Sequence, residues 1–211
     1  MKDLPLFTTP NGVATIILRN VPYTRTAYIR LCDAVAPGEF IKECCDFCRA
    51  VGAERVFATG HELLSQYDLH TRILKMQRDN NLPETDAAVL PVQAETMEQW
   101  REIYNEKMAT VPTAAMISFH EAKKYLAEGN CYFVHQGDTL LGIGVVSENR
   151  IDAIASIVPG EGRRVLSALS KALLSDTIEL YVAENNLPAM KLYQSLDFVT
   201  TGVVEQWHKI F

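Results

Sequence analysis

The 211-residue sequence has no uninterrupted apolar run near the roughly 20 residues that a membrane-spanning helix needs. Its start, MKDLPLFTTP, has no long apolar segment behind the lysine, so a secretory signal peptide is not expected. Basic residues are not in excess either, because 20 Lys and Arg stand against 26 Asp and Glu, for a net charge of -6. An acidic protein is not attracted as a whole to nucleic acid or anionic lipid, so we predict neither partner.

Cysteine is scarce as well, with Cys32, Cys44, Cys45, Cys48 and Cys131. An odd number of cysteines without a signal peptide is typical of a reducing compartment, so we predict a cytoplasmic protein. The sequence has one CxxC pair but no second pair and no histidine cluster at ligand spacing, so we predict no metal site. Helical spacing instead favours buried thiols on one helix face, shared by Phe40, Ile41, Cys44, Cys48 and Val51.

The first part of the chain reads as a small half-domain. β-Branched and aromatic residues predict strands at 13–18, 26–32, 54–59 and 70–77. A helix opened by Pro37 and Gly38 lies between the second and third of them. Residues 1–80 are therefore predicted to be ββαββ, and the polar segment 79–86 is the predicted domain boundary.

Residues 87–211 are predicted to form a second domain with the order βααβββαβαββ. The elements that matter for function come late in this order. They are a strand at 151–158, a helix GRRVLSALSKALLSD from Gly162, a strand at 177–182, a helix at 187–196 and two final strands.

The two halves share a short similarity: AVAPGEF and SIVPGEG each end a strand and open a helix. A helix and then another strand follow in both halves. Because three shared letters occur by chance, the similarity rests on the common order of elements, and we interpret it as a sign of duplication.

The segment IVPGEGRRVLSA, residues 157–168, combines a glycine loop with a helix start. The first backbone N–H groups of a helix lack internal partners and attract anions, and glycines let a phosphate approach closely. The helix dipole disfavours the positive charges of Arg163 and Arg164 in this first turn unless an anion is bound there. In the alternative interpretation the glycines only shape the turn, and the arginines are solvated or paired with Glu161.

The segment YVAENNLPAMKLYQSLDF, residues 181–198, is the second informative stretch. Asn185 or Asn186 provides an N-cap and Pro188 lies in the first helical turn. Tyr193 lies beside the apolar face of this helix. Taken alone, it is a core tyrosine with a satisfied hydroxyl.

The order VxxxNxxAxxLYxxxxF, from Val182 to Phe198, resembles the end of the GNAT superfamily of N-acetyltransferases. In that family a strand and a glycine loop, usually written R/Q-x-x-G-x-G/A, come before it, as here. The resemblance covers residues 87–211, and the first half, 1–80, resembles a degenerate second copy. It implies an α/β (α+β) acyl-CoA N-acyltransferase fold, with a mixed, mostly antiparallel central sheet flanked by helices and a smaller N-terminal ββαββ half-domain.

The sequence departs from the family pattern at two positions. Ile157 stands where the loop usually has Arg or Gln, which bears on pyrophosphate binding. Asp197 stands where Gly usually precedes the final Phe, at a helix end that favours left-handed geometry.

The resemblance implies that acetyl-CoA binds between the strands at 151–158 and 177–182. Backbone groups of Ile157 and Val158 would pair with the pantetheine arm, and Asn186 would bond to it. The pyrophosphate would rest on the loop and helix start, at Gly160, Gly162, Arg163 and Arg164.

Acetyl transfer needs a neutral amine and a proton for the departing sulfur. By the resemblance Tyr193 contacts the cofactor and is the general acid, because a phenol with a pKa of about 10 stays protonated. Glu179 is the candidate base, since a carboxylate in a central strand is costly unless it is paired or used. Glu179 paired with a basic residue is an equal alternative, and Asp152, Glu148 or a water chain could replace it as base.

The sequence therefore predicts an acetyl-CoA-dependent N-acetyltransferase that acts on a primary amine by direct transfer. The acceptor, a small molecule or a peptide, is not specified by any motif. The rival interpretation is a non-catalytic acyl-CoA-binding or structural module on the same fold, which Ile157 favours, whereas Asn186 and Tyr193 favour the enzyme.

Overall fold

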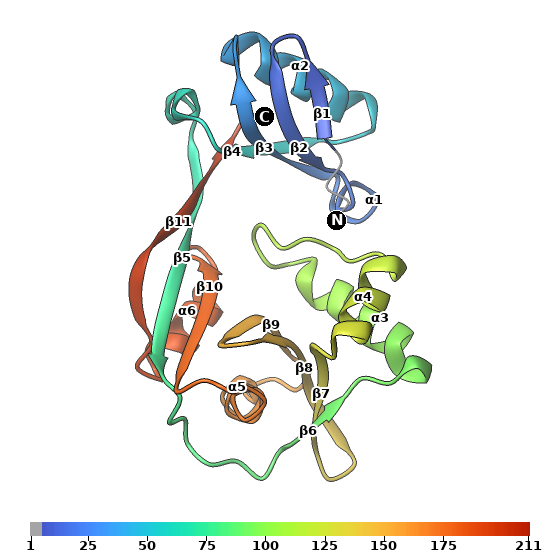
Figure 1. Ribbon diagram of the computed structural model, residues 1–211, viewed down its shortest axis with the longest axis vertical. Coiled ribbons are helices and arrows are strands. Elements are labelled where there is room, and N and C mark those ends of the chain that lie inside the picture. Colours follow the sequence, from blue (N-terminus) through green and yellow to red (C-terminus); the bar gives the residue numbers. More distant parts are fainter. Residues whose placement is uncertain (1–5) are drawn as a thin grey trace. The chain divides into compact units, whose positions relative to one another are not determined.

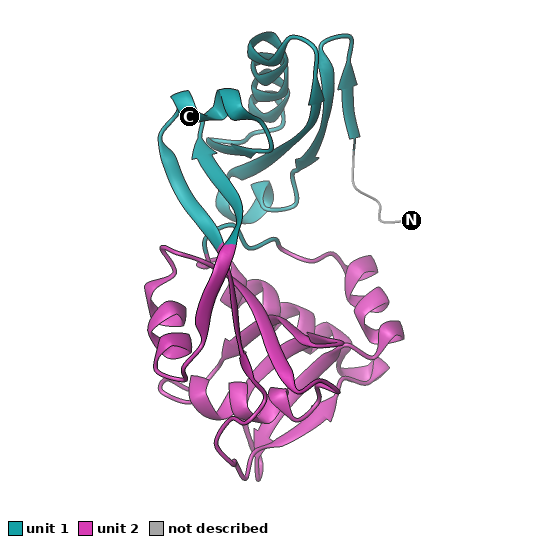
Figure 2. Ribbon diagram, turned by 60° about the vertical axis from the view of Figure 1, so that its left-hand side comes forward, with its two compact units in different colours: residues 1–73, 112–115, 203–211 teal, residues 74–111, 116–202 magenta. Residues whose placement is uncertain are grey.

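The structure is a computed structural model that describes residues 6–211, and these divide into two compact units (Figure 2). Unit 1 is formed by residues up to Ile73, by 112–115 and by 203–211. Unit 2 is formed by residues 74–111 and 116–202. Within the described residues, no helix is long and apolar enough to cross a membrane.

Unit 1 is a sheet with one long helix packed on it (Figure 1). Its strand order is β1-β2-β3-β4, followed by the C-terminal part of β11. In chain order its elements are β1 (Leu6–Thr9), β2 (Gly12–Ile17), α1 (Val21–Thr24), β3 (Thr26–Ala34), α2 (Pro37–Ala50), β4 (Arg55–Thr59), the 3₁₀ helix η1 (Glu62–Gln66) and the start of β5 (Leu69–Asp79).

Helix α2 begins at Pro37, as predicted, and buries one face against β2 and β3. Three cysteines lie on that face, Cys44, Cys45 and Cys48, each at most 3% exposed, together with Phe40 and Ile41. Burial raises the pKa of the Cys48 thiol to about 12 and that of Cys45 to about 11. These thiols are therefore protonated and poorly nucleophilic. The predicted buried helix face is confirmed except at Val51, which follows the helix as its C-cap and is 41% exposed.

Unit 2 has a larger sheet with helices on both faces. Its strand order runs from β11 through β5-β10-β9-β8-β7 to β6. In chain order its elements are the end of β5, β6 (Ala88–Pro91), the 3₁₀ helix η2 (Ala94–Thr96), α3 (Met97–Met108), α4 (Phe119–Glu128), β7 (Cys131–Gln136), β8 (Thr139–Ser147), β9 (Arg150–Ser156), α5 (Gly162–Ser170), β10 (Thr177–Ala183), α6 (Leu187–Gln194) and the start of β11 (Val199–Lys209).

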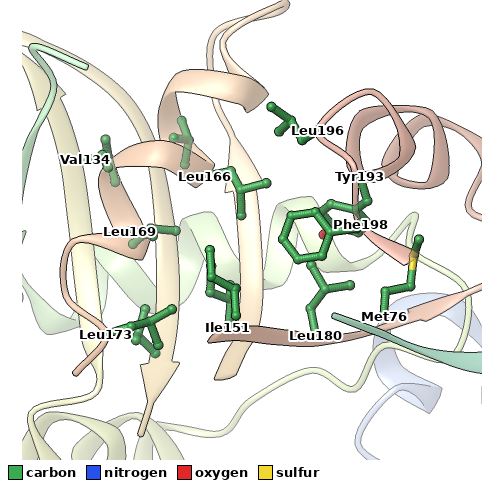
Figure 3. Packing of buried hydrophobic residues seen from close by; sticks show 14 of the residues in the cluster. Met76, Val134, Ile151, Leu166, Leu169, Leu173, Leu180, Tyr193, Leu196 and Phe198 are labelled. Atoms are coloured by element: carbon green, nitrogen blue, oxygen red, sulfur yellow. The ribbon is translucent and has the colours of Figure 1, made fainter. Parts of the chain in front are cut away.

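The core of unit 2 lies between the sheet and helices α5 and α6 (Figure 3). Leu166 and Leu169 of α5 meet Ile151 and Leu180 of the sheet there. The helix lies so close to β8 that a Cβ at Gly144 would be 2.3 Å from the side chain of Leu169. Glycine at this strand position therefore sets the distance between helix and sheet.

Three predictions differ from the structure. The predicted ββαββ order of the first half lacks strand β1 and the short helix α1. Helix α5 ends at Ser170 rather than near 176, because Ala172 and Leu173 donate to carbonyls three residues back, as in a 3₁₀ turn. The two predicted final strands form one continuous strand, β11. Strands β7 and β8 form a hairpin, and Gly137 in its turn has φ +54°.

Each unit has a parallel strand pair, β3 with β4 or β9 with β10. The strand beside β4 and the strand beside β10 each come from the other half of the sequence. Strand β4 is followed in the sheet by β11, the last strand of the sequence, and β10 is followed by β5. The register pairs His208 with Ala58 and Lys209 with Phe57, antiparallel. The two units are therefore not simply the parts of the chain before and after the predicted boundary at 79–86, because residues 203–211 belong to unit 1.

The predicted internal similarity corresponds to a shared order of elements. Apart from the short helix α1 between β2 and β3, the orders β1-β2-β3-α2-β4 and β7-β8-β9-α5-β10 agree: a strand, a helix and a parallel strand follow an antiparallel hairpin. The parallel pairs differ in length, however. β3 and β4 pair over five residues, from Thr26–Arg55 to Arg30–Thr59.

Candidate functional site

Strands β9 and β10 pair only where they begin. Their parallel register joins Arg150 to Glu179 and Ile151 to Leu180, whereas β9 continues to Ser156 and β10 to Ala183. Two parallel strands that part after two residue pairs leave facing edges with unused backbone groups. The two strands between which the resemblance places acetyl-CoA are thus splayed apart.

The edge of β9 that faces this gap belongs to Ser156 rather than to Ile157. The Ile157 N–H donates to the Leu141 carbonyl at 2.8 Å, and the Val158 N–H approaches the same oxygen at 3.4 Å. Because backbone groups alternate along an antiparallel strand, Ser156, opposite Gly142, directs its N–H and C=O away from β8. The pairing of a ligand with Ile157 and Val158 stays a prediction, and the register adds Ser156 as a candidate for the same role.

The two glycines of the loop, Gly160 and Gly162, are needed for different structural reasons. Gly160 has φ +87°, in the left-handed region, with nothing within 4 Å of where a Cβ would lie. A Cβ at Gly162 would be 3.1 Å from Leu192, so Gly162 lets α5 pack closely on α6. The space beside Gly160 is open, as a phosphate-binding loop requires.

The start of helix α5 has the predicted set of free donors. The first bond within the helix is from the Val165 N–H to the Glu161 carbonyl at 3.0 Å, and Glu161 makes no side-chain cap. Among the described residues, no hydrogen bond is found for the N–H groups of Gly162, Arg163 and Arg164. These three donors lie where an anion would be favoured.

The two arginines of this turn have partners at their sides. Arg164 donates to the Gln136 side chain at 2.6 Å and lies 3.5 Å from the Glu161 carboxylate. Arg163 makes long contacts of 3.3 and 3.4 Å with Ser195 at the end of α6. The predicted alternative, an arginine paired with Glu161, is thus present for Arg164, while Arg163 is only weakly bound.

Helix α6 begins as the sequence predicts. Asn186 is the N-cap, and its Oδ1 accepts the Ala189 N–H at 3.5 Å, with Pro188 in the first turn. This use of Oδ1 leaves the Nδ2 donor of Asn186 for a ligand. At the far end Asp197 has φ +60°, the left-handed geometry expected of a residue in the usual glycine position.

Tyr193 lies in the core of unit 2 (Figure 3). Its side chain is 5% exposed, and its ring packs 5.6 Å from that of Phe198. Burial raises the pKa of Tyr193 well above its usual value, so the phenol stays protonated at any physiological pH. The structure thus shows the packing expected of a core tyrosine together with the protonation state that a general acid needs.

Glu179 is paired, in keeping with the alternative interpretation. Its carboxylate is 2.6 Å from Lys75 Nζ and accepts a hydrogen bond from Gln77 at 2.9 Å. Burial raises its pKa, but hydrogen bonds from Lys75, Tyr181 and Gln77 outweigh this effect and hold the pKa below its usual value. A lowered pKa makes Glu179 a weaker base. Its β5 partners were not predicted from the sequence.

The other candidate bases lie elsewhere on unit 2. Asp152 is bonded to Arg150 and Ser147. Glu148 has φ +49° in the turn between β8 and β9. Across residues 6–211, no group of three or more His, Cys, Asp or Glu side chains is arranged to hold a metal ion.

Comparison with protein-family models and with curated proteins found no match. Solved structures with a similar fold do exist. A GCN5-related N-acetyltransferase from Anabaena variabilis gives a TM-score of 0.64 at 9% identity, over 94% of this chain and 59% of that chain. One from Sphaerobacter thermophilus gives 0.55 at 13% identity, over 93% and 75%. A conserved protein of unknown function from Staphylococcus epidermidis gives 0.58 at 10% identity, over 99% and 94%.

These likenesses confirm the predicted fold. The mixed, mostly antiparallel sheet flanked by helices is that of GCN5-related N-acetyltransferases. A fold hosts many functions, so the role of each site residue is argued from its geometry.

Proposed function

We propose that this chain is an acetyl-CoA-dependent N-acetyltransferase that transfers an acetyl group directly to a primary amine of its acceptor, at a site in unit 2. One observation carries the proposal. The parallel strands β9 and β10 part after two residue pairs, and the loop that follows β9 leads to a helix start with three N–H groups that have no partner within residues 6–211. An extended ligand with an anionic end fits this combination of strand edge and anion site.

The residues present fit acetyl-CoA, which would supply the acetyl group as a thioester. The N–H groups of Gly162, Arg163 and Arg164 would hold the pyrophosphate, with Gly160 leaving room for it. The edge of Ser156 and the Nδ2 of Asn186 would hold the pantetheine arm. Ile157, which lacks the charge of the usual Arg or Gln, would contribute only apolar contact.

The chain's own residues would manage two protons. Tyr193 is protonated and would donate its phenolic proton to the departing sulfur. Removal of the amine proton falls to water in this proposal, because Glu179 is engaged by Lys75 and Gln77 and has a lowered pKa. The Glu179 carboxylate would instead hold the Lys75 ammonium group in place, next to the first residue pair of β9 and β10.

A second candidate is the non-catalytic acyl-CoA-binding or structural module. Two observations favour it: the Tyr193 ring is packed in the core, and Arg164 is already paired with Glu161 and Gln136. The two candidates differ in turnover, not in fold.

Binding is tested by isothermal titration of acetyl-CoA. We expect one molecule per chain, because β3 and β4 stay paired over five residues and leave no equivalent gap in unit 1. Arg163→Glu with Arg164→Glu should weaken binding strongly through repulsion of the phosphates. Lys123→Glu with Lys124→Glu on α4 makes the same change of net charge and should leave the affinity nearly unchanged.

Two bound molecules per chain, or equal affinities in the two double variants, would contradict this placement. Turnover is tested by screening amines, amino acids and peptides for release of CoA. Binding without release for any acceptor would favour the non-catalytic module.

A further inference from the structure

Unit 1 contains a cavity of about 440 Å³ that the proposed acetyl transfer does not use. It opens where β4 and β11 stop pairing, beyond Ala58 and His208. Gly60 turns the chain there with φ +100°, so close to β3 that a Cβ would be 2.3 Å from the Leu31 carbonyl oxygen. The size is within the range of small-molecule sites, which is roughly 300 to 1,000 Å³.

Arg30, on the wall of this cavity, is held in a fixed position. It is paired with Glu205 at 2.5 Å, and its guanidinium lies 5.9 Å from the ring centre of Trp207. The other carboxylate oxygen of Glu205 accepts the Trp207 indole N–H at 3.0 Å. A guanidinium has five donors, so this arrangement orients Arg30 while leaving donors for a carboxylate.

Two histidines on the wall have defined tautomers. His61 Nδ1 accepts the Leu63 N–H at 3.1 Å, so the neutral ring carries its proton on Nε2 and can donate there. His208 Nδ1 lies 3.1 Å from the Tyr67 carbonyl, which can only accept, so the neutral ring of His208 offers Nε2 as an acceptor. Through Nε2, a neutral His61 ring can therefore donate a hydrogen bond and a neutral His208 ring can accept one.

The charges of the wall have both signs. Arg30 is positive, whereas Glu62 and Glu205 are negative. A simple anion would meet the two carboxylates, and a simple cation would meet the guanidinium. A small molecule with a carboxylate and an ammonium group can satisfy both signs at once.

We propose that this cavity binds a free α-amino acid, with the carboxylate against Arg30 and His61 and the ammonium group toward Glu62. This site lies wholly in unit 1 and does not depend on the acetyltransferase proposal.

The chain offers an internal control for a binding experiment. Its two tryptophans lie in different units, and the indole N–H of Trp207 donates to the cavity residue Glu205, whereas that of Trp100 donates to Tyr132 in unit 2. The full chain labelled with ¹⁵N is titrated with single L-amino acids at millimolar concentration. At least one amino acid should move the Trp207 indole resonance in a saturable way and leave that of Trp100 unmoved.

Variants and blocked ligands test the proposed contacts. Arg30→Gln should weaken binding about tenfold or more, as should acetylation of the amino group or amidation of the carboxylate. Arg25→Gln is the control, because Arg25 forms an exposed pair with Glu54 at 3.8 Å outside the cavity. If Arg30→Gln does not fold, His61→Asn keeps an acceptor for the Leu63 N–H and removes the Nε2 donor.

Three outcomes would overturn the proposal. No amino acid moves the Trp207 resonance, or blocked ligands bind as well as free ones, or the folded cavity variants bind as tightly as the unaltered chain.

Discussion

At the scale of single residues, the enzyme proposal depends most on Tyr193. Its ring is part of the unit 2 core, and the described residues provide no hydrogen bond to its hydroxyl. Tyr193→Phe therefore removes only the oxygen and should change stability little. If the hydroxyl protonates sulfur, turnover should fall by roughly 10² or more, with a much smaller change in acetyl-CoA affinity.

Turnover, acetyl-CoA affinity and thermal unfolding measured on one Tyr193→Phe preparation check this prediction. Tyr28→Phe is the control for turnover only, because Tyr28 is 7% exposed and lies in unit 1, whereas its hydroxyl is hydrogen-bonded to the Thr113 backbone. Undiminished turnover of Tyr193→Phe would remove this residue from the mechanism.

Asp197 gives a second prediction at this scale, and it concerns stability. Its φ of +60° is costly for a residue with a Cβ, although less so for Asp than for most others. Asp197→Gly should therefore raise the free energy of unfolding by about 1 kcal/mol. Asp197→Ala, which removes the charge but keeps the Cβ, should give no such gain in a urea titration.

The opposite substitution at Gly160, from glycine to a residue with a Cβ, checks the same argument about backbone geometry. Gly160 has φ +87° and open space around it, so Gly160→Ala introduces backbone strain without a clash. It should lower the free energy of unfolding by about 1 kcal/mol. If Asp197→Gly and Gly160→Ala changed the free energy of unfolding in the same direction, backbone geometry would not be the cause.

At the scale of elements, strands β5 and β10 are joined by the pair of Lys75 and Glu179. The lowered pKa of Glu179 means that the carboxylate stabilises the folded state fully above its ordinary pKa of 4.5. That stabilisation is lost as pH falls through the lower pKa of the folded state. Glu179→Gln should lower stability at pH 7 by about 1 to 3 kcal/mol and flatten the loss of stability in acid.

Chemical unfolding at a series of pH values measures this effect. Glu54→Gln is the control, because Glu54 is 71% exposed and its ion pair contributes little. A Glu179→Gln variant with the same acid dependence as the unaltered chain would contradict the assignment.

The pair also shows which parts of the structure the sequence could predict. Local signals were sufficient for α2, which Pro37 opens, and for α6, which Asn186 caps. The contact of Gln77 with Glu179 spans 102 positions, and alternation within a strand indicates which face a side chain takes but not which strand lies beside it. The same reason explains why the sequence did not indicate Ser156, whose backbone groups the register directs away from β8.

At the scale of the whole molecule, each unit contains a strand from the other half of the sequence. Strand β11 lies beside β4 in unit 1, and strand β5 lies beside β10 in unit 2. Trp207 is 4% exposed and packs with Tyr28 and Phe57, and Ile210 and Phe211 pack against the unit 1 core. The Ile210 N–H also donates to the Val56 carbonyl at 2.9 Å. Unit 1 is therefore incomplete until the last residues of the chain have been made.

A chain that ends at Gly202 should consequently lose structure in its N-terminal part. Hydrogen exchange at the amides of α2 and β4 should become much faster, because removal of β11 exposes the edge of β4 and the ring of Phe57. Amides of α5 and β8 should stay protected, since their core contains no residue beyond Phe198. If β4 and α2 kept their protection in this truncated chain, the assignment of 203–211 to unit 1 would be wrong.

Single substitutions of the two tryptophans test the same division without shortening the chain. Trp207→Ala should lower the free energy of opening of unit 1 by about 3 to 5 kcal/mol, since a buried indole leaves a large cavity. Trp100→Ala should have a similar effect, but on the part of unit 2 around α3, where Trp100 is fully buried and donates to the Tyr132 carbonyl at 3.2 Å. Each substitution is the control for the other in one hydrogen-exchange experiment. An opening that spreads equally over both units in either variant would show that they unfold together, and strands β5 and β11 would then couple the two units rather than complete each one separately.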